Sequence, residues 1–275
     1  MSNATQTEIL RKEVQLRPWD SFVSLYVREM KRFMKVIFQT VFTPLVNSTL
    51  YLLIFGVSLG ANIQLENNVS YLAFLIPGLV MMGVLNNAFQ NSSSSIVSGK
   101  FSGDLEDLKV VPLTPQMILW AMSIAGLTRG LLVGFVTYAV GEVFQYVIDG
   151  SFTAVAHPFH LLFFLAVGGL TFANLGVAVA FWAKTFDQMS AIGSFILLPL
   201  IYLGGVFFSL KGLHPFWQGV AHFNPVLYLI NGVRYGLLGV SDVDVGLAAG
   251  VSLASLVLFQ FLGLRALRQG SYTRW

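Results

Sequence analysis

Long apolar stretches alternate with short polar segments along most of this chain. Five windows contain no Asp, Glu, Lys or Arg: residues 36–65, 67–99, 150–183, 188–210 and 245–264. A sixth apolar stretch, residues 110–141, contains a single charge, Arg129. Because a helix needs about 20 apolar residues to cross a bilayer, the pattern predicts six membrane-spanning helices. We place them at residues 36–60, 70–92, 116–140, 159–183, 190–209 and 246–265.

Composition supports a membrane protein. Of the 275 residues, 55% are hydrophobic and 11% are charged, whereas soluble domains carry roughly 25% charged residues. A water-soluble enzyme is therefore excluded, and the fold class is an all-α membrane protein. The absence of cysteine excludes disulfide scaffolds and thiolate metal sites. A net charge of +3 is too small to indicate nucleic-acid binding.

The basic residues predict the orientation. With six spans both termini share a side, and the positive-inside rule assigns that side to the cytoplasm. The inner side then holds Arg11, Lys12, Arg17, Arg28, Lys31, Arg32, Lys35, Lys100, Lys109, Lys184, Arg265, Arg268 and Arg274, and the outer side holds Lys211 and Arg234. This predicts a cytoplasmic N-terminal segment (1–35), a transmembrane domain (36–265) and a cytoplasmic tail (266–275).

Residues 19–37 have the period of an amphipathic helix. The predicted apolar face is Phe22, Leu25, Tyr26, Met30, Phe33 and Ile37, and the predicted polar face is Ser24, Arg28, Lys31, Arg32 and Lys35. Such a basic helix lies along the inner membrane surface. Two interpretations remain open: an anchor to anionic membrane lipids, and a docking surface for a partner subunit.

Two segments between the spans are unusual. Residues 103–108 form a short acidic stretch followed by Pro112 and Pro115, which is either a connector or a protrusion that a soluble partner could receive. Residues 210–245 lie outside by count and yet are largely apolar. We expect them to form short broken helices that dip into the bilayer edge against protein, where irregular backbone is tolerated.

Motifs for chemistry are missing from the sequence. No Gly-x-x-x-x-Gly-Lys-Ser/Thr phosphate loop, His-Glu-x-x-His zinc site or Gly-x-Ser-x-Gly elbow occurs. The pairs His157/His160 and His214/His222 are better explained as interfacial polar residues than as metal ligands. We therefore expect no catalytic, cofactor-binding or metal-binding residues on this chain.

A few polar residues inside the spans are candidates for a pathway or a switch. Asn86, Asn87 and Gln90 lie near the inner end of the second span, where they either line a pathway or join helices. Arg129 costs about 2.5–3.5 kcal/mol at a helix centre. It therefore needs a partner, and the two interpretations are a structural tie to another helix and a contact to an anionic substrate or a pivot.

Several blocks of this sequence resemble a known family over nearly the whole chain. They are Lys31-Arg32-Phe33-Met34, residues 75–82, residues 103–108 with Pro112-Leu113, residues 198–209, Pro215-Phe216-Trp217, Asn224-Pro225 and Gly232-Val233-Arg234. The chain resembles the membrane subunit of an ABC-2 type transporter, and in particular the YadH-like inner-membrane transport permeases of bacteria.

The resemblance implies partners and roles. It implies a six-helix subunit in the bacterial inner membrane that works as a homodimer with two ABC ATPase subunits, which carry the ATP and Mg²⁺. The implied interface helix includes Arg28, Glu29, Lys31, Arg32 and Lys35. The implied ATPase-coupling residues are Gly103, Asp104, Leu105, Glu106 and Leu108. The implied family pattern near the outer side is Pro199, Gly204, Gly205, Asn224, Pro225 and Arg234.

The expected function is an export permease that forms the substrate pathway and is driven by separate ATPases. An alternative is an ATP-independent secondary transporter or channel, which predicts repeated halves with paired broken helices. We see no such duplication in the sequence. A membrane-embedded enzyme is disfavoured by the missing acid, base and nucleophile motifs.

Overall fold

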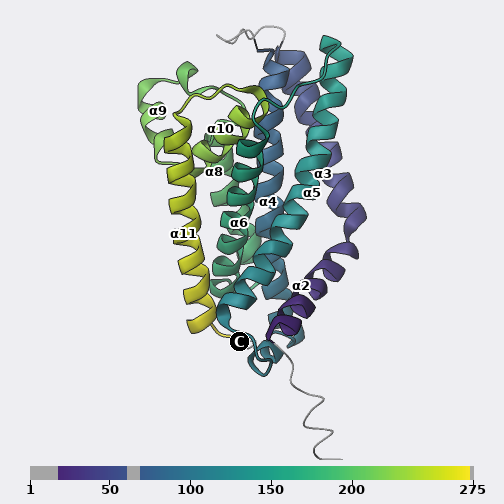
Figure 1. Ribbon diagram of the computed structural model, residues 1–275, viewed down its shortest axis with the longest axis vertical. Coiled ribbons are helices and arrows are strands. Elements are labelled where there is room, and N and C mark those ends of the chain that lie inside the picture. The colour runs from purple at the N-terminus through teal and green to yellow at the C-terminus, as the bar shows by residue number, and fades with distance from the viewer. Residues whose placement is uncertain (1–17, 61–68, 273–275) are drawn as a thin grey trace, which may run out of the picture.

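The computed structural model describes residues 18–60 and 69–272, and within these ranges the regular elements are all helical (Figure 1). Six helical segments are long and apolar enough to cross a membrane, as the sequence predicts. They are α3 with its continuation η1 (Ile37–Leu59), α4 (Tyr71–Ser102), α5 (Pro115–Asp149), α6 (Pro158–Trp182), α7 with η4 and α8 (Phe186–Leu203), and α11 (Val245–Gln269).

Helix α4 forms the centre of the bundle and packs against α5, α6 and α10 (Pro225–Leu238). All ten residues from Tyr71 to Val80 are buried, as expected for a helix that is apolar on every side. Helices α4 and α6 come very close at Gly176, where an added Cβ would lie 2.6 Å from the carbonyl oxygen of Phe89. A small residue is therefore required at this crossing.

The second and third spans are much longer than the sequence predicts, and the sixth, expected at 246–265, also continues to Gln269. The second was expected at 70–92, but α4 continues to Ser102, and the third was expected at 116–140, but α5 runs from Pro115 to Asp149. The serine-rich stretch is buried, and its hydroxyls find acceptors on helix carbonyls, as Ser93 Oγ donates to Phe89 O at 2.7 Å, so burial leaves them satisfied. Helices α4 and α5 each end at a glycine with positive φ, Gly103 at 86° and Gly150 at 68°.

The spans containing α3 and α7 each include a stretch of wide π-helical turns. Helix α3 (Ile37–Tyr51) continues as η1 (Leu52–Leu59), and α7 (Phe186–Ile192) continues through η4 (Gly193–Leu197) into α8 (Leu198–Leu203). Pro199 explains the second stretch, because its ring nitrogen has no hydrogen to donate to the carbonyl four residues earlier.

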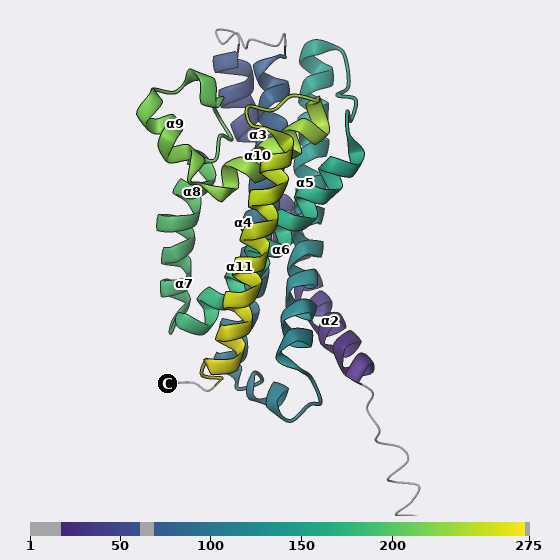
Figure 2. The same cartoon turned by 60° about the vertical axis from the view of Figure 1, so that its left-hand side comes forward.

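The two ends of the bundle differ (Figure 2). Helix α2 (Pro18–Met34) and the C-terminal end of α11 lie at one end, here called the α2 end. The opposite end, here called the α10 end, holds η5 (Leu210–Gly212), α9 (Pro215–His222) and α10. The expected short helices within residues 210–245 are present. Their depth in a bilayer stays a prediction.

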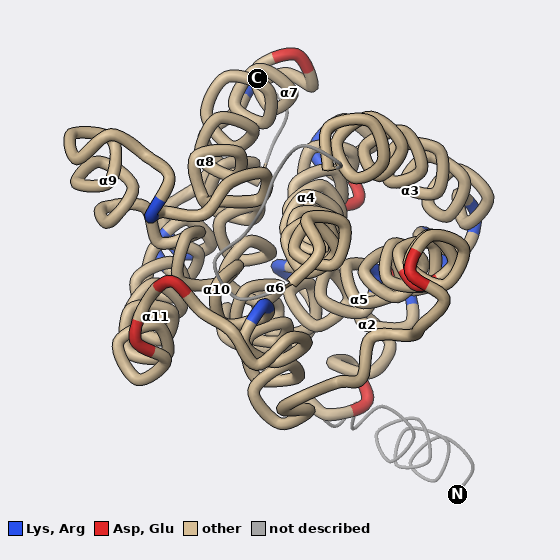
Figure 3. Tube along the Cα trace, turned by 90° about the horizontal axis from the view of Figure 1, so that it is seen from above, with Lys and Arg blue, Asp and Glu red and all other residues tan. Residues whose placement is uncertain are grey.

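Seen along the bundle axis, most of the chain carries neither acidic nor basic residues (Figure 3).

Candidate functional site

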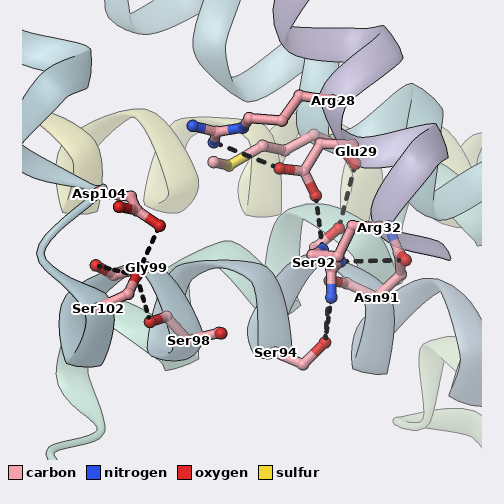
Figure 4. Close-up of polar contacts among 11 residues, drawn as sticks. Arg28, Glu29, Arg32, Asn91, Ser92, Ser94, Ser98, Gly99, Ser102 and Asp104 are labelled. Atoms are coloured by element: carbon pink, nitrogen blue, oxygen red, sulfur yellow. Dashed lines mark hydrogen bonds and ion pairs between the residues drawn. The ribbon is translucent and has the colours of Figure 1, made fainter. Parts of the chain in front are cut away.

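A buried carboxylate of α2 holds the arginine that joins α2 to the bundle. Glu29 is only 2% exposed, and it accepts hydrogen bonds from Arg32 Nε at 3.1 Å and Arg28 Nη2 at 3.4 Å. Arg32 then reaches α4, where Nη2 donates to Asn91 O at 2.7 Å and Nη1 donates to Ser94 Oγ at 3.1 Å (Figure 4). Glu29 and Arg32 therefore form a polar clasp between α2 and α4.

This clasp divides the predicted interface-helix residues into two groups. Arg28, Lys31 and Lys35 are exposed, whereas Glu29 is buried and Arg32 points toward α4. Sequence periodicity placed Arg32 on the solvated face, but its hydrogen bonds to α4 turn it inward. A surface-docking role is thus left to the three exposed basic residues.

We expect Glu29→Ala to loosen α2 from the bundle. Without the carboxylate, Arg32 loses the negative charge that compensates its guanidinium beside α4, which destabilises the contact. Hydrogen–deuterium exchange of the α2 amides should rise severalfold. Lys31→Ala, on the exposed face of the same helix, is the control and should leave exchange unchanged. Equal exchange in both variants would show that the clasp does not hold α2.

The acidic turn, residues 103–109, follows α4 directly. Gly103 ends the helix, the chain reverses, and Leu105 N donates to Gly99 O at 3.1 Å. Leu105 and Leu108 are buried among residues of α2, α4 and α5, including Leu25 and Ile96. The exposed residues of the turn include Asp104, Glu106 and Asp107.

The sequence-predicted coupling residues thus have two different environments. Leu105 and Leu108 fix the turn to the bundle, and the acidic side chains form the surface that a partner could contact. Ser102 Oγ donates to Asp104 Oδ2 at 2.8 Å and orients that carboxylate. Asp107 was not among the predicted residues, although its place in the same acidic run could have indicated it.

Two side chains next to the turn connect it to other spans. Lys100 is buried, and its Nζ donates to Ala180 O at 2.9 Å and Phe181 O at 3.1 Å, two carbonyls in the last turn of α6. Phe101 stacks on Phe186 at the start of α7, with ring centroids 5.3 Å apart. A displacement of the acidic turn would therefore be transmitted to both α6 and α7.

Tyr272 completes the packing at the α2 end. Its hydroxyl donates to Leu267 O at 2.8 Å, its ring packs against Phe181, and Lys109 Nζ lies 4.8 Å from the ring centroid. Burial raises the pKa of the Tyr272 phenol, so the residue acts as a neutral donor. Tyr272 is thereby held beside the acidic turn.

A polar cavity of about 720 Å³ lies between α3 on one side and α7, η4 and α8 on the other, with α4 and α5 behind it. The predicted pathway residues Asn86, Asn87, Gln90 and Arg129 all line it. At one edge Tyr51 and Tyr202 bridge α3 and α8 with their hydroxyl oxygens 3.1 Å apart. The arrangement offers many hydrogen-bonding groups to a bound molecule.

Sequence reasoning missed the polar lining from the other spans. Gln39, Thr43 and Asn47 of α3 line the cavity, as do Ser190 and Ser194 of α7 and η4. Each set has a spacing of four residues, which places its members on one helix face. Polar residues at this spacing within apolar spans were the signal that could have revealed them.

Arg129 projects into this cavity from the middle of α5. Its Nε is buried and has no hydrogen-bond partner among the described residues. The guanidinium carbon lies 5.9 Å from the centroid of the Phe33 ring. The ion pairs found in the described part of the chain are both made by Glu29, with Arg28 and Arg32, so neither of them satisfies Arg129.

The α10 end is organised around another buried arginine. Arg234 is 1% exposed, its Nη2 donates to Gly205 O at 2.7 Å, and its guanidinium lies 3.8 Å from the centroid of the Phe74 ring. Asn231 Oδ1 accepts from Arg234 Nη1 at 3.5 Å and from the backbone N of Asp242 at 3.0 Å. Arg234 therefore joins α10 to the chain reversal after α8.

The other predicted residues of this region lie around the same reversal. Gly204 packs where an added Cβ would be 2.8 Å from Val226 Cγ1, and Gly205 has a φ of 86°. Asn224 caps α10 by accepting from Val226 N at 3.0 Å, and its Nδ2 donates to Leu200 O at 2.6 Å. Pro225 is the first residue of α10, a position where proline is favoured.

The histidines lie away from the cavity. His157 stacks on Tyr235 with ring centroids 4.4 Å apart, and His160 meets the same ring edge-on at 5.1 Å. In the part of the chain that the structure describes, no three His, Cys, Asp or Glu side chains form a cluster that could hold a metal ion.

Comparison with known proteins agrees with this geometry. Residues 20–238 match the family model described as ABC-2 type transporter. The chain belongs to the ABC-2 type transporter family. It is therefore a membrane permease subunit of a transporter, and its six apolar helices make it a multi-pass inner-membrane protein, as the sequence predicts.

Individual relatives in this family match along most of their length. The inner membrane transport permease YadH of Escherichia coli K12 is 37% identical over 252 residues, which cover 92% of this chain and 96% of YadH. YadH of Shigella flexneri gives the same figures, 37% over 252 residues. Nodulation protein J of Neorhizobium galegae is 26% identical over 253 residues, covering 90% of this chain and 93% of that protein.

Proposed function

We propose that this chain is the permease of an ABC exporter and that the polar cavity is part of its substrate route. The proposal is carried by one observation: the cavity joins all four predicted pathway residues with polar residues of α3, α7 and η4. Such a collection of polar groups between apolar spans serves either binding or helix packing, and a volume of about 720 Å³ favours binding.

We place the α2 end in the cytoplasm. This end carries the exposed basic residues of α2, Lys109 of the acidic turn, Lys184, and Arg265 and Arg268 of α11. The α10 end carries the exposed Lys211. Arg234, counted on the outer side from sequence, is buried and does not weaken the asymmetry. The exposed basic face of α2 then lies where it can contact anionic lipid headgroups.

We further propose that the transporter contains two copies of this chain. In one copy, the cavity is walled by α3, α4, α5 and α7. The segments α3 and η4 beside it expose large apolar side chains. Phe38 of α3 is 88% exposed and Phe195 of η4 is 79% exposed. A second copy placed across α3 and η4 would cover these rings and enclose the cavity.

The ATPase subunits, two per transporter, would bind at the acidic turn and carry ATP and Mg²⁺. The turn suits this role because its leucines fix it to the bundle while its carboxylates are exposed. Movement imposed there would reach α6 through Lys100 and α7 through the Phe101–Phe186 stack. Since α7 borders the cavity, the same movement would change the substrate route.

Charge reversal tests the coupling assignment. We expect the double variant Asp104→Lys with Glu106→Lys to lose co-purification with a co-expressed ABC ATPase and to lose stimulation of its ATP hydrolysis by at least about tenfold, since like-charge contacts at an interface cost several kcal/mol. Asp187→Lys, also exposed at this end, is the matched control and should retain both. Intact association and stimulation in the double variant would show that the turn is not the coupling element.

The alternative, an ATP-independent transporter, makes the opposite prediction. The chain alone in liposomes would then transport substrate when driven by an ion gradient, with no ATPase present.

A further inference from the structure

The polar cavity carries a positive charge that no acidic residue among its described lining residues neutralises. Among the described residues that line it, Arg129 is the single charged side chain, and no Asp or Glu lines it. The other polar lining groups are amides, hydroxyls and phenols, which are neutral. The cavity is therefore positive, with the charge located at one point on its α5 wall.

Among the described residues, no carboxylate forms an ion pair with Arg129. Glu29 is bound by Arg28 and Arg32 at 3.4 and 3.1 Å. The second nearby charge, Arg32, repels Arg129. Phe33 offers the face of its ring at 5.9 Å, a weak substitute for a carboxylate. The guanidinium thus keeps an uncompensated positive charge inside the bundle.

Two residues that line the cavity have a buried polar atom without a hydrogen-bond partner in the described part of the chain. Arg129 Nε has no hydrogen-bond partner among the described residues, and neither does Thr40 Oγ1, which also lines the cavity. An uncompensated buried charge is costly unless a counter-ion or well-placed hydrogen bonds accompany it. A guanidinium has five donors in a planar fork that matches carboxylate, phosphate or sulfate oxygens.

We propose that Arg129 binds an oxyanionic group of the transported molecule, with neighbouring amide and hydroxyl groups of the cavity binding its polar portions. Asn86, Asn87 and Gln90 of α4 and Thr43 of α3 line the same volume, and their amides and hydroxyl both donate and accept. The substrate class is therefore anionic and rich in hydrogen-bonding groups. This inference rests on the proposed role of the cavity as the substrate route.

Binding to the purified chain tests it without any ATPase, so that a failure here is separate from a failure of the coupling experiment. The probes in neutral maltoside detergent are dodecyl phosphate, dodecyltrimethylammonium with the same apolar chain, and inorganic phosphate alone. We expect saturable binding of dodecyl phosphate and none of the cation. Competition by inorganic phosphate would show that a free anion suffices, and its absence would show that the apolar chain is also needed; both agree with the proposal.

Variants localise the site. Arg129→Gln should weaken dodecyl phosphate binding about tenfold or more, because hydrogen bonds to charged groups are the strong ones, and Arg129→Lys should weaken it less. Arg268→Gln, at an exposed position near the end of α11, is the control and should bind as the wild type does. Unchanged binding in Arg129→Gln, or an equal loss in Arg268→Gln, would overturn the proposal.

A second readout does not depend on Arg129 variants folding. The chain has no cysteine, so Thr43→Cys introduces a single thiol on the cavity wall. Dodecyl phosphate should slow its labelling by a maleimide severalfold, and dodecyltrimethylammonium should not. Equal labelling rates with and without dodecyl phosphate would contradict binding in this cavity.

Discussion

The Gly176→Ala variant is expected to unfold at a markedly lower temperature than the wild-type protein. A methyl group at this position of α6 would lie 2.6 Å from the carbonyl oxygen of Phe89 and 3.3 Å from its Cα. Both atoms belong to the backbone of α4, so no side-chain rotation relieves the overlap and the two helices must separate. Overpacking of this kind costs about 1–3 kcal/mol. Thermal unfolding in detergent, followed by tryptophan fluorescence, measures it.

Gly250→Ala is the matched control for this substitution. Gly250 lies inside α11, and an added Cβ there meets nothing within 4 Å. Alanine is also the better helix former, so the unfolding temperature should stay the same or rise. If both variants unfold at the same temperature, α4 and α6 do not cross as closely at Gly176 as the structure shows.

Lys100→Met is expected to destabilise the α2 end of the bundle. The substitution keeps most of the aliphatic stem but removes the ammonium group that bonds the carbonyls of Ala180 and Phe181. Hydrogen bonds to charged groups contribute about 1.5–3 kcal/mol each. A positive charge near the C-terminal end of α6 also stabilises the helix by interacting with its dipole. The unfolding temperature should fall by several degrees, and amide exchange should rise at the junction between α6 and α7.

The control for Lys100→Met is Lys31→Met, which removes the same charge from an exposed position on α2. It should change neither the unfolding temperature nor amide exchange at the junction. If Lys100→Met behaves like this control, the ammonium group does not stabilise the end of α6.

The six spans were predictable because each is an apolar run of bilayer length, and this signal is local. The ends of the spans were not equally visible. The serine-rich end of α4 has the composition of a loop. It forms a helix that is buried by α5 and α6, and hydroxyls such as that of Ser93 are satisfied by the helix's own carbonyls. Burial by distant helices is not encoded in the local pattern.

The candidate site shows the same division. Asn86, Asn87, Gln90 and Arg129 were predicted because polar groups within apolar spans are rare, and the structure brings them to one cavity. The separation of the acidic turn into buried leucines and exposed carboxylates required the fold. Leu105 and Leu108 have the three-residue spacing of a 3₁₀ helix, but a four-residue helix is too short for that period to be recognised in the sequence.

The position of Arg32 was beyond local reasoning for another reason. Its partner Asn91 lies 59 residues away in sequence, so the pairing depends on the packing of α2 against α4. A helical wheel places Arg32 on the polar face of α2. Only the contact with α4 shows that its side chain is directed toward the bundle.

The π-helical stretch η4 has a geometric consequence for the cavity. A π turn accommodates an extra residue compared with an α turn, and one residue of an α-helix corresponds to about 100° of rotation. Tyr202 follows η4 in the chain. If η4 changed to α-helical winding and lost this extra residue, Tyr202 would rotate by about a quarter turn around the helix axis, away from Tyr51. The hydrogen bond between their hydroxyls would then break. A change in the winding of this helix would therefore also open this edge of the cavity.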